Sequence, residues 1–317
     1  MSVWEREEVQ AVLREQIVSE SGQARGERSF AKYLPPDEVE FMLITSRANP
    51  KIKEIRRLFT RKYRQRTGLF FVEGLQLVEE AVAMHADITT LVVAPELLSE
   101  ESAKGLVSVR ERAEVPCLEV TGEVFSSISP RDGQQGIGAV ACQRWDSLDD
   151  IGPATDFCWV AADQIRHPGS LGTILRVCDA VGGEGVILIG DASDPYDPTA
   201  VRASLGAVFS QRLAKASFGE FAAWRQRQNC FVVGTSPTSS TDYRAVSYGT
   251  PAVLFMGSDR RGLSAEQQAI CDVMVRIPMV GRCDSHHVAV ATGIVLYEMF
   301  NQRGPAKNRV PHEHALS

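Results

Sequence analysis

Short apolar runs alternate with longer amphipathic stretches over most of the chain from residue 41 to residue 303. Apolar runs of this length, bounded by Gly and Pro, predict β-strands, and the stretches between them predict helices. In the second half of the chain the predicted strands are 157–162, 185–190, 230–235, 252–257 and 273–278. Because short apolar strands that alternate with helices are typical of a parallel sheet covered on both faces, we predict an α/β domain here.

The first half repeats this alternation in a smaller unit. Its predicted helices are 50–60, 75–84 and 101–112, and its predicted strands are 68–72, 91–94, 117–120 and 136–142. The segment 143–156 is polar and contains Gly and Pro, which is typical of a boundary between domains. We therefore predict an N-terminal extension and linker (1–40), a small α/β domain (41–145), a second α/β domain (155–303) and a C-terminal tail (304–317).

Charge is distributed unevenly along the chain. The whole sequence has a formal net charge of −6, but residues 47–66 carry many lysines and arginines with Glu54 as the single acid. A basic stripe on an acidic chain is the pattern expected for contacts with nucleic-acid phosphates, although a solvated helix face is the more common meaning of a charge run. The cations that we predict to bind RNA are Lys51, Lys53, Arg56, Arg57, Arg61 and Lys62.

Composition disfavours several classes of protein. No apolar run approaches the roughly 18 to 20 residues that cross a bilayer, and the N-terminus is too acidic for a signal or transit peptide, so we place the protein in the cytoplasm. The 7 cysteines are scattered, with no two of them three positions apart, which predicts free thiols and no metal site. The glycine motifs of NAD-binding and P-loop proteins are missing from the sequence, so binding of those nucleotides loses support.

The loops after residues 162, 235, 257 and 278 form the candidate site, because ligands of a parallel α/β sheet bind beyond the carboxyl ends of its strands. The first loop contains Pro168 and two glycines and leads into a predicted helix, 173–181, that presents Arg176. A helix N-terminus with an arginine can hold a phosphate, although a strand-to-helix turn with a surface arginine gives the same pattern. The last loop leads into a long apolar helix at Ser285, a residue type that caps helix N-termini.

Three blocks of the sequence resemble, in order, the signature motifs of the SpoU/TrmH family of RNA ribose 2′-O-methyltransferases. They are 163–182 continuing to 201–209, then LFMGSDRRGLS at 254–264, then IPMVGRCDSHHVAVA at 277–291. The first domain also resembles the RNA-binding module of that family at 49–58, 70–81 and 134–141. The resemblance implies a SPOUT fold with a deep trefoil knot at the C-terminal end of the parallel-sheet domain. It further implies a homodimer and S-adenosylmethionine as the cofactor.

The resemblance assigns roles to individual residues. Its implied catalytic residues are Arg176, Ser170, Asp259, Ser285 and His287, of which Arg176 matches the arginine proposed to contact a phosphate or to activate the 2′-hydroxyl. The residues implied to cradle the cofactor are Thr235, Ser236, Met256, Gly257, Ser258, Gly262, Ile277, Met279, His287 and Val288, and those implied to face phosphate are Arg202 and Ser204. Because the sulfonium is an activated donor, such a site has only to align an oxygen with the methyl group and help remove a proton.

Three positions depart from the family pattern. Ser170 stands where the family usually has Asn, Asp259 where it has Glu, and His287 where it has Asn. An imidazole can take over as acceptor or general base near neutral pH. The other interpretation is a degenerate site that binds RNA without methylating it. Because the glycines and the proline of the three motifs are retained, we favour an active enzyme.

The predicted function is S-adenosylmethionine-dependent methylation of a ribose 2′-hydroxyl in RNA. We favour ribosomal RNA as the substrate, because the first domain resembles the type found in rRNA methyltransferases and many tRNA-specific relatives lack it. The alternatives are a catalytically degenerate RNA-binding or assembly protein on the same fold, a tRNA 2′-O-methyltransferase, and a metabolic α/β enzyme without affinity for RNA.

Overall fold

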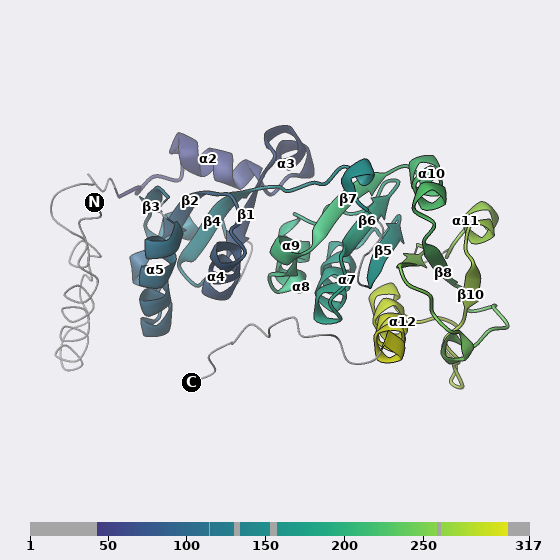
Figure 1. Cartoon of the computed structure of the whole chain (residues 1–317). Coiled ribbons are helices and arrows are strands. Elements are labelled where there is room, and N and C mark those ends of the chain that lie inside the picture. The colour runs from purple at the N-terminus through teal and green to yellow at the C-terminus, as the bar shows by residue number, and fades with distance from the viewer. Residues whose placement is uncertain (1–42, 114, 130–133, 153–156, 259–260, 304–317) are drawn as a thin grey trace.

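The computed structural model describes residues 43–303, except 114, 130–133, 153–156 and 259–260, and Figure 1 shows two α/β units joined by a single crossing of the chain. The predicted extension 1–40 and tail 304–317 lie outside the described residues. Within the described ranges, no helix is both long and apolar enough to span a membrane.

The first unit is built on a mixed sheet of four strands in the order β1-β4-β2-β3. Strand β4 pairs antiparallel with β1 and β2, and β2 pairs parallel with β3. The strands are β1 (Leu69–Glu73), β2 (Ile88–Val93), β3 (Cys117–Glu119) and β4 (Ile137–Cys142). Helices α4 (Leu75–Ala83) and α5 (Glu100–Ala113) cover one face, and α2 (Pro50–Arg57) and α6 (Gly122–Ser126) cover the other.

The predicted helix 50–60 is α2, which ends at Arg57, and a helix that was not predicted, α3 (Arg61–Thr67), follows it. Helix α2 begins where Asn49 accepts a hydrogen bond from the Lys51 amide at 2.9 Å, and it buries Ile52 and Ile55. Thr60 has extended backbone and precedes α3, which ends at the left-handed Gly68. Helix α3 was not predicted because the apolar spacing of α2 stops at Leu58, and the largely polar α3 has no stripe that a pattern search detects.

The second unit is a sheet of six strands in the order β10-β8-β9-β5-β6-β7, and every neighbouring pair is parallel. This confirms the predicted parallel sheet. Its strands are β5 (Cys158–Asp163), β6 (Gly185–Ile189), β7 (Arg212–Ala216), β8 (Phe231–Thr235), β9 (Ala252–Met256) and β10 (Val273–Val275). Strand β7 was not predicted, because Arg212 and Lys215 interrupt its apolar run.

Helices cover both faces of the larger sheet, as predicted. One face carries α7 (Pro168–Ala180), α8 (Pro198–Ser204), α9 (Ala207–Ser210) and α12 (Val288–Arg303), and the other carries α10 (Phe218–Gln228) and α11 (Ala265–Ala269). Successive strand residues enter the two cores alternately: Val160 and Ala162 of β5 face α7, whereas Trp159 and Ala161 face α10.

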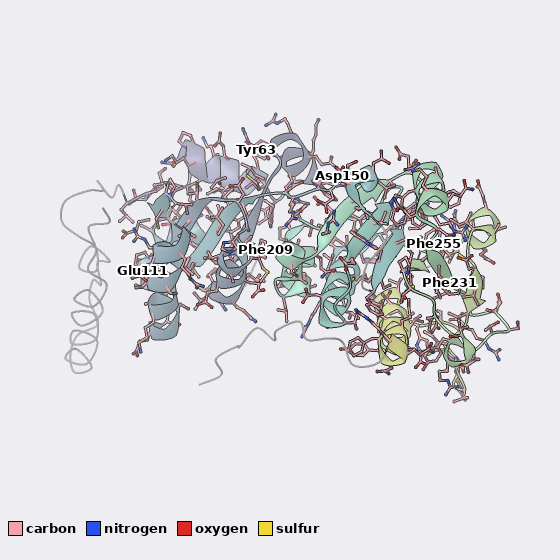
Figure 2. The ribbon with its side chains drawn as sticks, in the orientation of Figure 1. Tyr63, Glu111, Asp150, Phe209, Phe231 and Phe255 are labelled. Atoms are coloured by element: carbon pink, nitrogen blue, oxygen red, sulfur yellow. The ribbon has the colours of Figure 1, made fainter. Side chains whose placement is uncertain are left out.

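The cores of the two units touch through aromatic side chains. Phe70 of β1 lies 4.6 Å from Tyr196 and 6.0 Å from Phe209, measured between ring centroids. Figure 2 shows Phe209 between the first sheet and the helices of the second. Trp145 then packs edge-on against Tyr196 at 5.4 Å, so the crossing segment itself is part of this contact.

Candidate active site

The loops predicted to form the site leave the larger sheet at one edge. In the strand register Ala162 of β5 is opposite Met256 of β9, and Thr235 of β8 is opposite Val275 of β10. The Thr235 hydroxyl lies 3.7 Å from the Met256 sulfur, which joins β8 to β9 at the same level. The carboxyl ends of four neighbouring strands therefore meet, as expected for a ligand site in a parallel sheet.

Helix α7 carries the first motif and begins at Pro168, five residues before the predicted start at 173. The error came from treating Pro168 and Gly172 as loop residues. Proline suits the first turn of a helix because the lost N–H has no partner there. Gly172 lies where α7 crosses α8, and a Cβ at this position would be 2.2 Å from the Ala200 carbonyl oxygen. Glycine here allows the two helices to pack in direct backbone contact.

Ser170 and His287, two of the positions that depart from the family pattern, contact each other. The Ser170 hydroxyl lies 2.9 Å from Nε2 of His287, although the residues are 117 positions apart. Ser170 is 5% exposed in the first turn of α7, whereas the His287 side chain is exposed at the mouth of the last loop. The pair therefore joins the first motif to the third, with a fixed hydroxyl on one side and a reachable imidazole on the other.

His287 is held by backbone hydrogen bonds at the start of the last helix. Helix α12 starts at Val288, and the His287 carbonyl accepts hydrogen bonds from the amides of Val290 and Ala291 at 2.9 and 3.0 Å. The predicted helix start at Ser285 was too early, and the Ser285 hydroxyl bonds Asp284 Oδ1 at 3.1 Å instead of a helix amide. Ser285 is exposed in the loop before the helix.

Arg176 lies on α7, six residues after Ser170, and its side chain is exposed. At 100° and 1.5 Å per residue the two side chains are about 9 Å apart along the helix and point in different directions. Within the described ranges the guanidinium forms no hydrogen bond or ion pair. It is therefore available to a ligand, and it is not a partner of the Ser170 and His287 pair.

The second motif forms a tight loop directly after β9. The Gly262 amide donates to the Ser258 carbonyl at 2.9 Å, and Gly262 has a left-handed φ of 61°. A Cβ at Gly257 would be 2.2 Å from the backbone of Gly262, so only glycine fits at the base of the loop. Asp259 lies outside the described residues.

The remaining cofactor candidates line the ends of β8 and β10. The Ser236 amide donates to the Val275 carbonyl at 2.9 Å, which aligns the two loops. Ile277 and Met279 are half-buried in the segment that follows β10, and Val288 is buried at the start of α12. The edge thus presents small residues, backbone polar groups and apolar side chains within one region, which suits an adenosine with a polar tail.

Sequence reasoning missed a buried acid at this edge. Asp163, the last residue of β5, is 5% exposed, and its burial raises the pKa of the carboxyl while a hydrogen bond from Gln267 opposes that rise. The Gln267 side chain also accepts from the Ser264 amide at 2.8 Å. This chain of contacts ties the first motif to the helix that follows the second. An acid directly after a buried strand, in the first residue of a motif, was the available signal.

Most of the predicted RNA-binding cations are exposed, but two have partners within the protein. The side chains of Lys51, Lys53 and Lys62 are exposed and form no hydrogen bond or ion pair with another described residue. Arg56 bonds the Ser127 hydroxyl at 2.8 Å, and Arg61 bonds the Ala192 carbonyl at 3.0 Å. The basic stripe is therefore divided between cations that face solvent and cations that hold the fold.

Two further candidates lie on α8, and Arg57 lies beside an aromatic ring. Arg202 is exposed, whereas Ser204 is 1% exposed and its hydroxyl donates to the Val201 carbonyl at 2.7 Å. Ser204 thus supports the end of α8 in this arrangement and does not face solvent. The Arg57 guanidinium stands 5.9 Å from the centroid of the Tyr63 ring.

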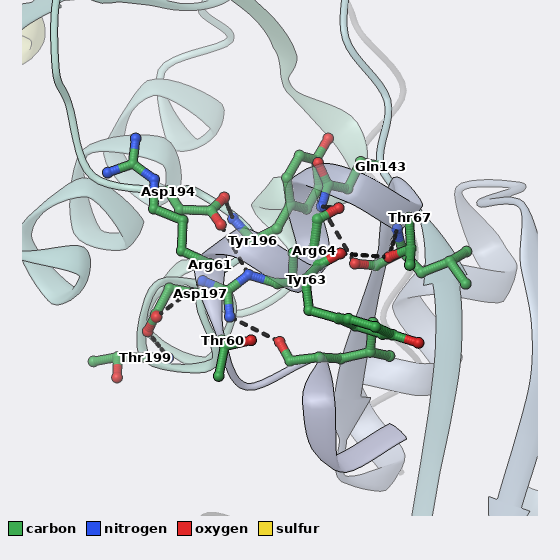
Figure 3. Close-up of polar contacts among 12 residues, drawn as sticks. Thr60, Arg61, Tyr63, Arg64, Thr67, Gln143, Asp194, Tyr196, Asp197 and Thr199 are labelled. Carbon is green, nitrogen blue, oxygen red and sulfur yellow. Dashed lines mark hydrogen bonds and ion pairs between the residues drawn. The ribbon is translucent and has the colours of Figure 1, made fainter. Parts of the chain in front are cut away.

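One cation of the stripe, Arg64, is buried between the two units (Figure 3). Its side chain is 1% exposed and reaches from α3 to Asp194 at 2.8 Å and Asp197 at 3.2 Å, both in the second unit. A third hydrogen bond goes to the Leu58 carbonyl at 2.8 Å. Nearby, Tyr196 accepts from the Arg144 amide at 2.8 Å. We call Arg64, Asp194 and Asp197 the interdomain clamp.

The parallel sheet with three motif loops at its carboxyl edge, preceded by a separate α/β module with exposed cations, defines a two-domain RNA-modifying enzyme. The chain belongs to the SpoU rRNA methylase family, whose model matches residues 158–297, and the model of the MRM3-like substrate binding domain matches residues 49–139. This confirms the family predicted from the motifs.

The chain is similar to characterised relatives over most of its length. It is 31% identical to the 23S rRNA (uridine(2479)-2′-O)-methyltransferase of Streptomyces viridochromogenes, covering 82% of this chain and 92% of that protein. It is 26% identical to the 23S rRNA (guanosine(2553)-2′-O)-methyltransferase of Bacillus subtilis, covering 81% and 98%.

Among solved structures, the AdoMet-bound rRNA methyltransferase of Sinorhizobium meliloti has a TM-score of 0.73 and 39% identity, over 82% of this chain and 97% of that one. The SpoU methyltransferase AviRb of Streptomyces viridochromogenes, in complex with AdoMet, has a TM-score of 0.73 and 29% identity, over 80% and 98%. The predicted arrangement of a parallel-sheet domain after a smaller α/β domain is thereby confirmed.

Proposed function

We propose that this protein transfers a methyl group from S-adenosylmethionine to a ribose 2′-hydroxyl of ribosomal RNA. The observation that carries the proposal is the convergence of the three motif loops at one sheet edge, where Ser170 of the first motif bonds His287 of the third at 2.9 Å. The relatives that support ribosomal RNA as the substrate are 23S rRNA methyltransferases aligned over both units of the chain. We place the reaction in the cytoplasm.

The residues at the sheet edge fit S-adenosylmethionine. Backbone groups after Thr235, Met256 and Val275 are gathered within three adjacent strand ends, and half-buried Ile277 and Met279 offer an apolar surface to the adenine. The other residues that would hold the cofactor are Ser236, Gly257, Ser258, Gly262, His287 and Val288. Bound there, the cofactor supplies a methyl group already activated by the sulfonium charge.

His287 is the residue that we assign to proton removal. When Nε2–H of the ring donates to the Ser170 oxygen, Nδ1 keeps a free lone pair and can accept the proton of the 2′-hydroxyl. Ser170 is then a positioning residue, because its buried hydroxyl holds the orientation of the ring.

Arg176 serves the RNA in this proposal. Its exposed guanidinium lies about two turns from Ser170 along α7, a distance that suits a phosphate next to the reacting ribose better than the reacting hydroxyl itself. A planar guanidinium binds phosphate through paired hydrogen bonds, which would hold the ribose in line with the methyl group.

The first domain, proposed as 41–145, docks the RNA, and the second, proposed as 155–303, carries the chemistry. The exposed cations Lys51, Lys53, Arg57 and Lys62 supply the phosphate contacts. Clustered cations on a chain of net charge −6 give local affinity for RNA without coating the whole surface.

The proposal includes a knotted path and a homodimer. The side chain of Gln302, near the end of α12, bonds the Tyr248 amide at 3.2 Å and the Val246 carbonyl at 3.0 Å, so the last helix is attached to the long β8 to β9 loop. On α12 the apolar side chains of Val290 and Tyr297 are 51% and 48% exposed, which supports burial against a second copy.

The test is calorimetry with S-adenosylhomocysteine followed by methylation of purified RNA with radiolabelled S-adenosylmethionine. We expect binding of the cofactor product and label in 23S rRNA, mapped to one ribose by primer extension at low nucleotide concentration. Binding of RNA without S-adenosylhomocysteine would favour the degenerate RNA-binding protein. Label in tRNA alone would favour the tRNA enzyme, and binding of neither RNA nor cofactor would overturn the family function for this chain.

A further inference from the structure

A groove between the two units lies next to the candidate active site and is not used by the mechanism above. Its first wall comes from the α2 to α3 junction, β1 and α4, and its second wall comes from α8. The lining residues are Phe59, Phe71, Glu73, Leu77, Pro198, Thr199, Val201 and Arg202. The groove thus joins the domain proposed to dock RNA to the domain proposed to methylate it.

The interdomain clamp fixes the two walls relative to each other. Arg64 extends from α3, which directly follows Phe59, and binds Asp197, the residue that caps α8. Asp197 accepts from the Thr199 amide at 3.0 Å, so the second wall begins at the clamp itself (Figure 3). Because a buried, hydrogen-bonded ion pair is costly to break, the groove is a preformed feature.

The groove is continuous with the first turn of α7. The Thr199 side chain lies against Gly169, where an added Cβ would be 3.7 Å from the Thr199 methyl group. The next residue along α7 is Ser170, which bonds His287. The α8 wall of the groove therefore packs against the turn of α7 that carries Ser170, the partner of the proposed proton acceptor.

The groove is chemically divided. Phe59 is half-buried and packs edge-on against Phe71 at 6.1 Å, which leaves part of an aromatic ring on the first wall. Glu73 places a carboxylate on the same wall, where Ser129 donates to it at 2.8 Å. Arg202 on the opposite wall is exposed, and its guanidinium forms no hydrogen bond or ion pair with another described residue. The first wall, with aromatic rings and a carboxylate, suits a base. The opposite wall, with the Arg202 guanidinium, suits the phosphate of the same nucleotide.

We propose that this groove binds one unpaired RNA nucleotide adjacent to the methylated ribose, with its base against Phe59 and its phosphate at Arg202. The inference rests on the proposed function, because it needs RNA as the substrate. Single-stranded bases gain affinity from aromatic side chains with little regard to base identity. Repulsion from the Glu73 carboxylate disfavours a phosphate on the first wall. The groove therefore selects for an unpaired neighbour, and a base-paired one is excluded by its partner strand.

The test uses the full chain, a 23S rRNA transcript and two groove variants, Phe59→Leu and Arg202→Gln. Phe59→Leu keeps an apolar side chain but removes the ring, and we expect RNA affinity to fall about tenfold. Arg202→Gln should lower the slope of log affinity against log salt by about one phosphate contact. A transcript with 5-iodouridine, irradiated in complex with the wild type, should crosslink to peptides that contain Phe59 or Phe71.

Matched controls are Phe218→Leu, a half-buried phenylalanine on α10, and Arg227→Gln, an exposed arginine on the same helix. Both should bind RNA as the wild type does, and all four variants should keep wild-type affinity for S-adenosylhomocysteine, which reports a folded second domain. The groove proposal is overturned if the groove variants bind RNA with the same affinity and the same salt slope as the controls. If the wild type still methylates rRNA, the proposed function stands. A wild type that binds no RNA would overturn both.

Discussion

At the scale of single residues, the contact between Ser170 and His287 changes how their departure from the family pattern is interpreted. The resemblance implies asparagine at both of these positions, which are 117 residues apart, and the Ser170 and His287 side chains that stand there are 2.9 Å from each other. A histidine without a partner in this loop would support a degenerate site. The hydrogen bond between the two side chains supports an active one instead. The hydroxyl and the imidazole together offer a donor and an acceptor, as two amides do.

We predict that His287→Asn lowers the single-turnover rate of methyl transfer by about 10²-fold, because an amide cannot accept the proton of the 2′-hydroxyl. Rapid-quench kinetics with saturating cofactor would measure the loss. An unchanged rate in His287→Asn would remove the imidazole from proton removal.

Ser170→Ala separates positioning from structure in the same assay. We expect a rate at least several-fold lower, because the ring is no longer held by the hydroxyl at 2.9 Å. Ser170→Asn, which restores an oxygen acceptor for the ring, should recover part of the rate. Thermal unfolding of both variants serves as the control for stability.

Arg176→Ala should reduce methyl transfer by two orders of magnitude or more and leave the affinity for S-adenosylhomocysteine nearly unchanged. The exposed guanidinium has no role in the described fold, and a lost positioning contact to substrate is felt in the rate. Single-turnover kinetics and calorimetry on the same preparation would check both parts. An unaltered rate would exclude Arg176 from the reaction.

At the scale of elements, the strands and the long helices could be predicted because their apolar residues repeat with the right period. The short or polar elements could not: α3 has no apolar stripe, and β7 is interrupted by Arg212 and Lys215. Strand β7 accommodates these two cations because each packs over a tryptophan ring. Arg212 lies over Trp159, and Lys215 lies over Trp145. Such partners come from distant segments, which a local pattern cannot supply.

The site was predictable as a set of loops and not as a set of contacts. Ligands of a parallel sheet bind beyond the carboxyl ends of its strands, and this rule correctly predicted that Thr235, Met256 and Gly257 lie at one edge. It succeeds because it depends only on strand direction. The bond between Ser170 and His287 depends on how α12 returns across the sheet. The role of Arg64 depends on how the two units dock, which a local charge pattern does not show.

The double variant Arg57→Ala with Lys62→Ala should weaken rRNA binding and lower its salt slope by about two, one for each lost phosphate contact. Both side chains are exposed on the α2 to α3 segment, and the described fold places no ion pair on either. Filter binding at several salt concentrations would measure the slope. The control is Lys104→Ala with Arg112→Ala on α5, which should leave the slope unchanged.

At the scale of the whole molecule, the interdomain clamp should be visible in stability. Arg64→Ala leaves Asp194, whose side chain is 9% exposed, without its cation, and we expect a loss of about 3 kcal/mol. Thermal or urea unfolding of the full chain would detect the loss as a lower midpoint. The control is Arg227→Ala, whose ion pair with Asp149 is solvated on both sides and should cost far less.

The proposed dimer predicts a mass twice that of one chain by light scattering after gel filtration. Val290, Ile294 and Tyr297 follow each other at helical spacing on α12, so one apolar stripe is available for the contact. Tyr297→Glu should yield the monomer, because a carboxylate in a buried apolar contact is costly. A monomeric wild type at micromolar concentration would contradict the proposal.

The interdomain clamp also determines which partner must adapt during recognition. Because a buried arginine holds the two units together, we expect the distance from the exposed cations of α2 to the imidazole of His287 to change little when RNA binds. An RNA whose docking element and target ribose are separated by a different distance has to bend or unpair to match the protein. The RNA, and not the protein, then pays the deformation energy. We therefore expect the protein to act as a ruler: it chooses one ribose among many chemically identical ones by its distance from a docked structure.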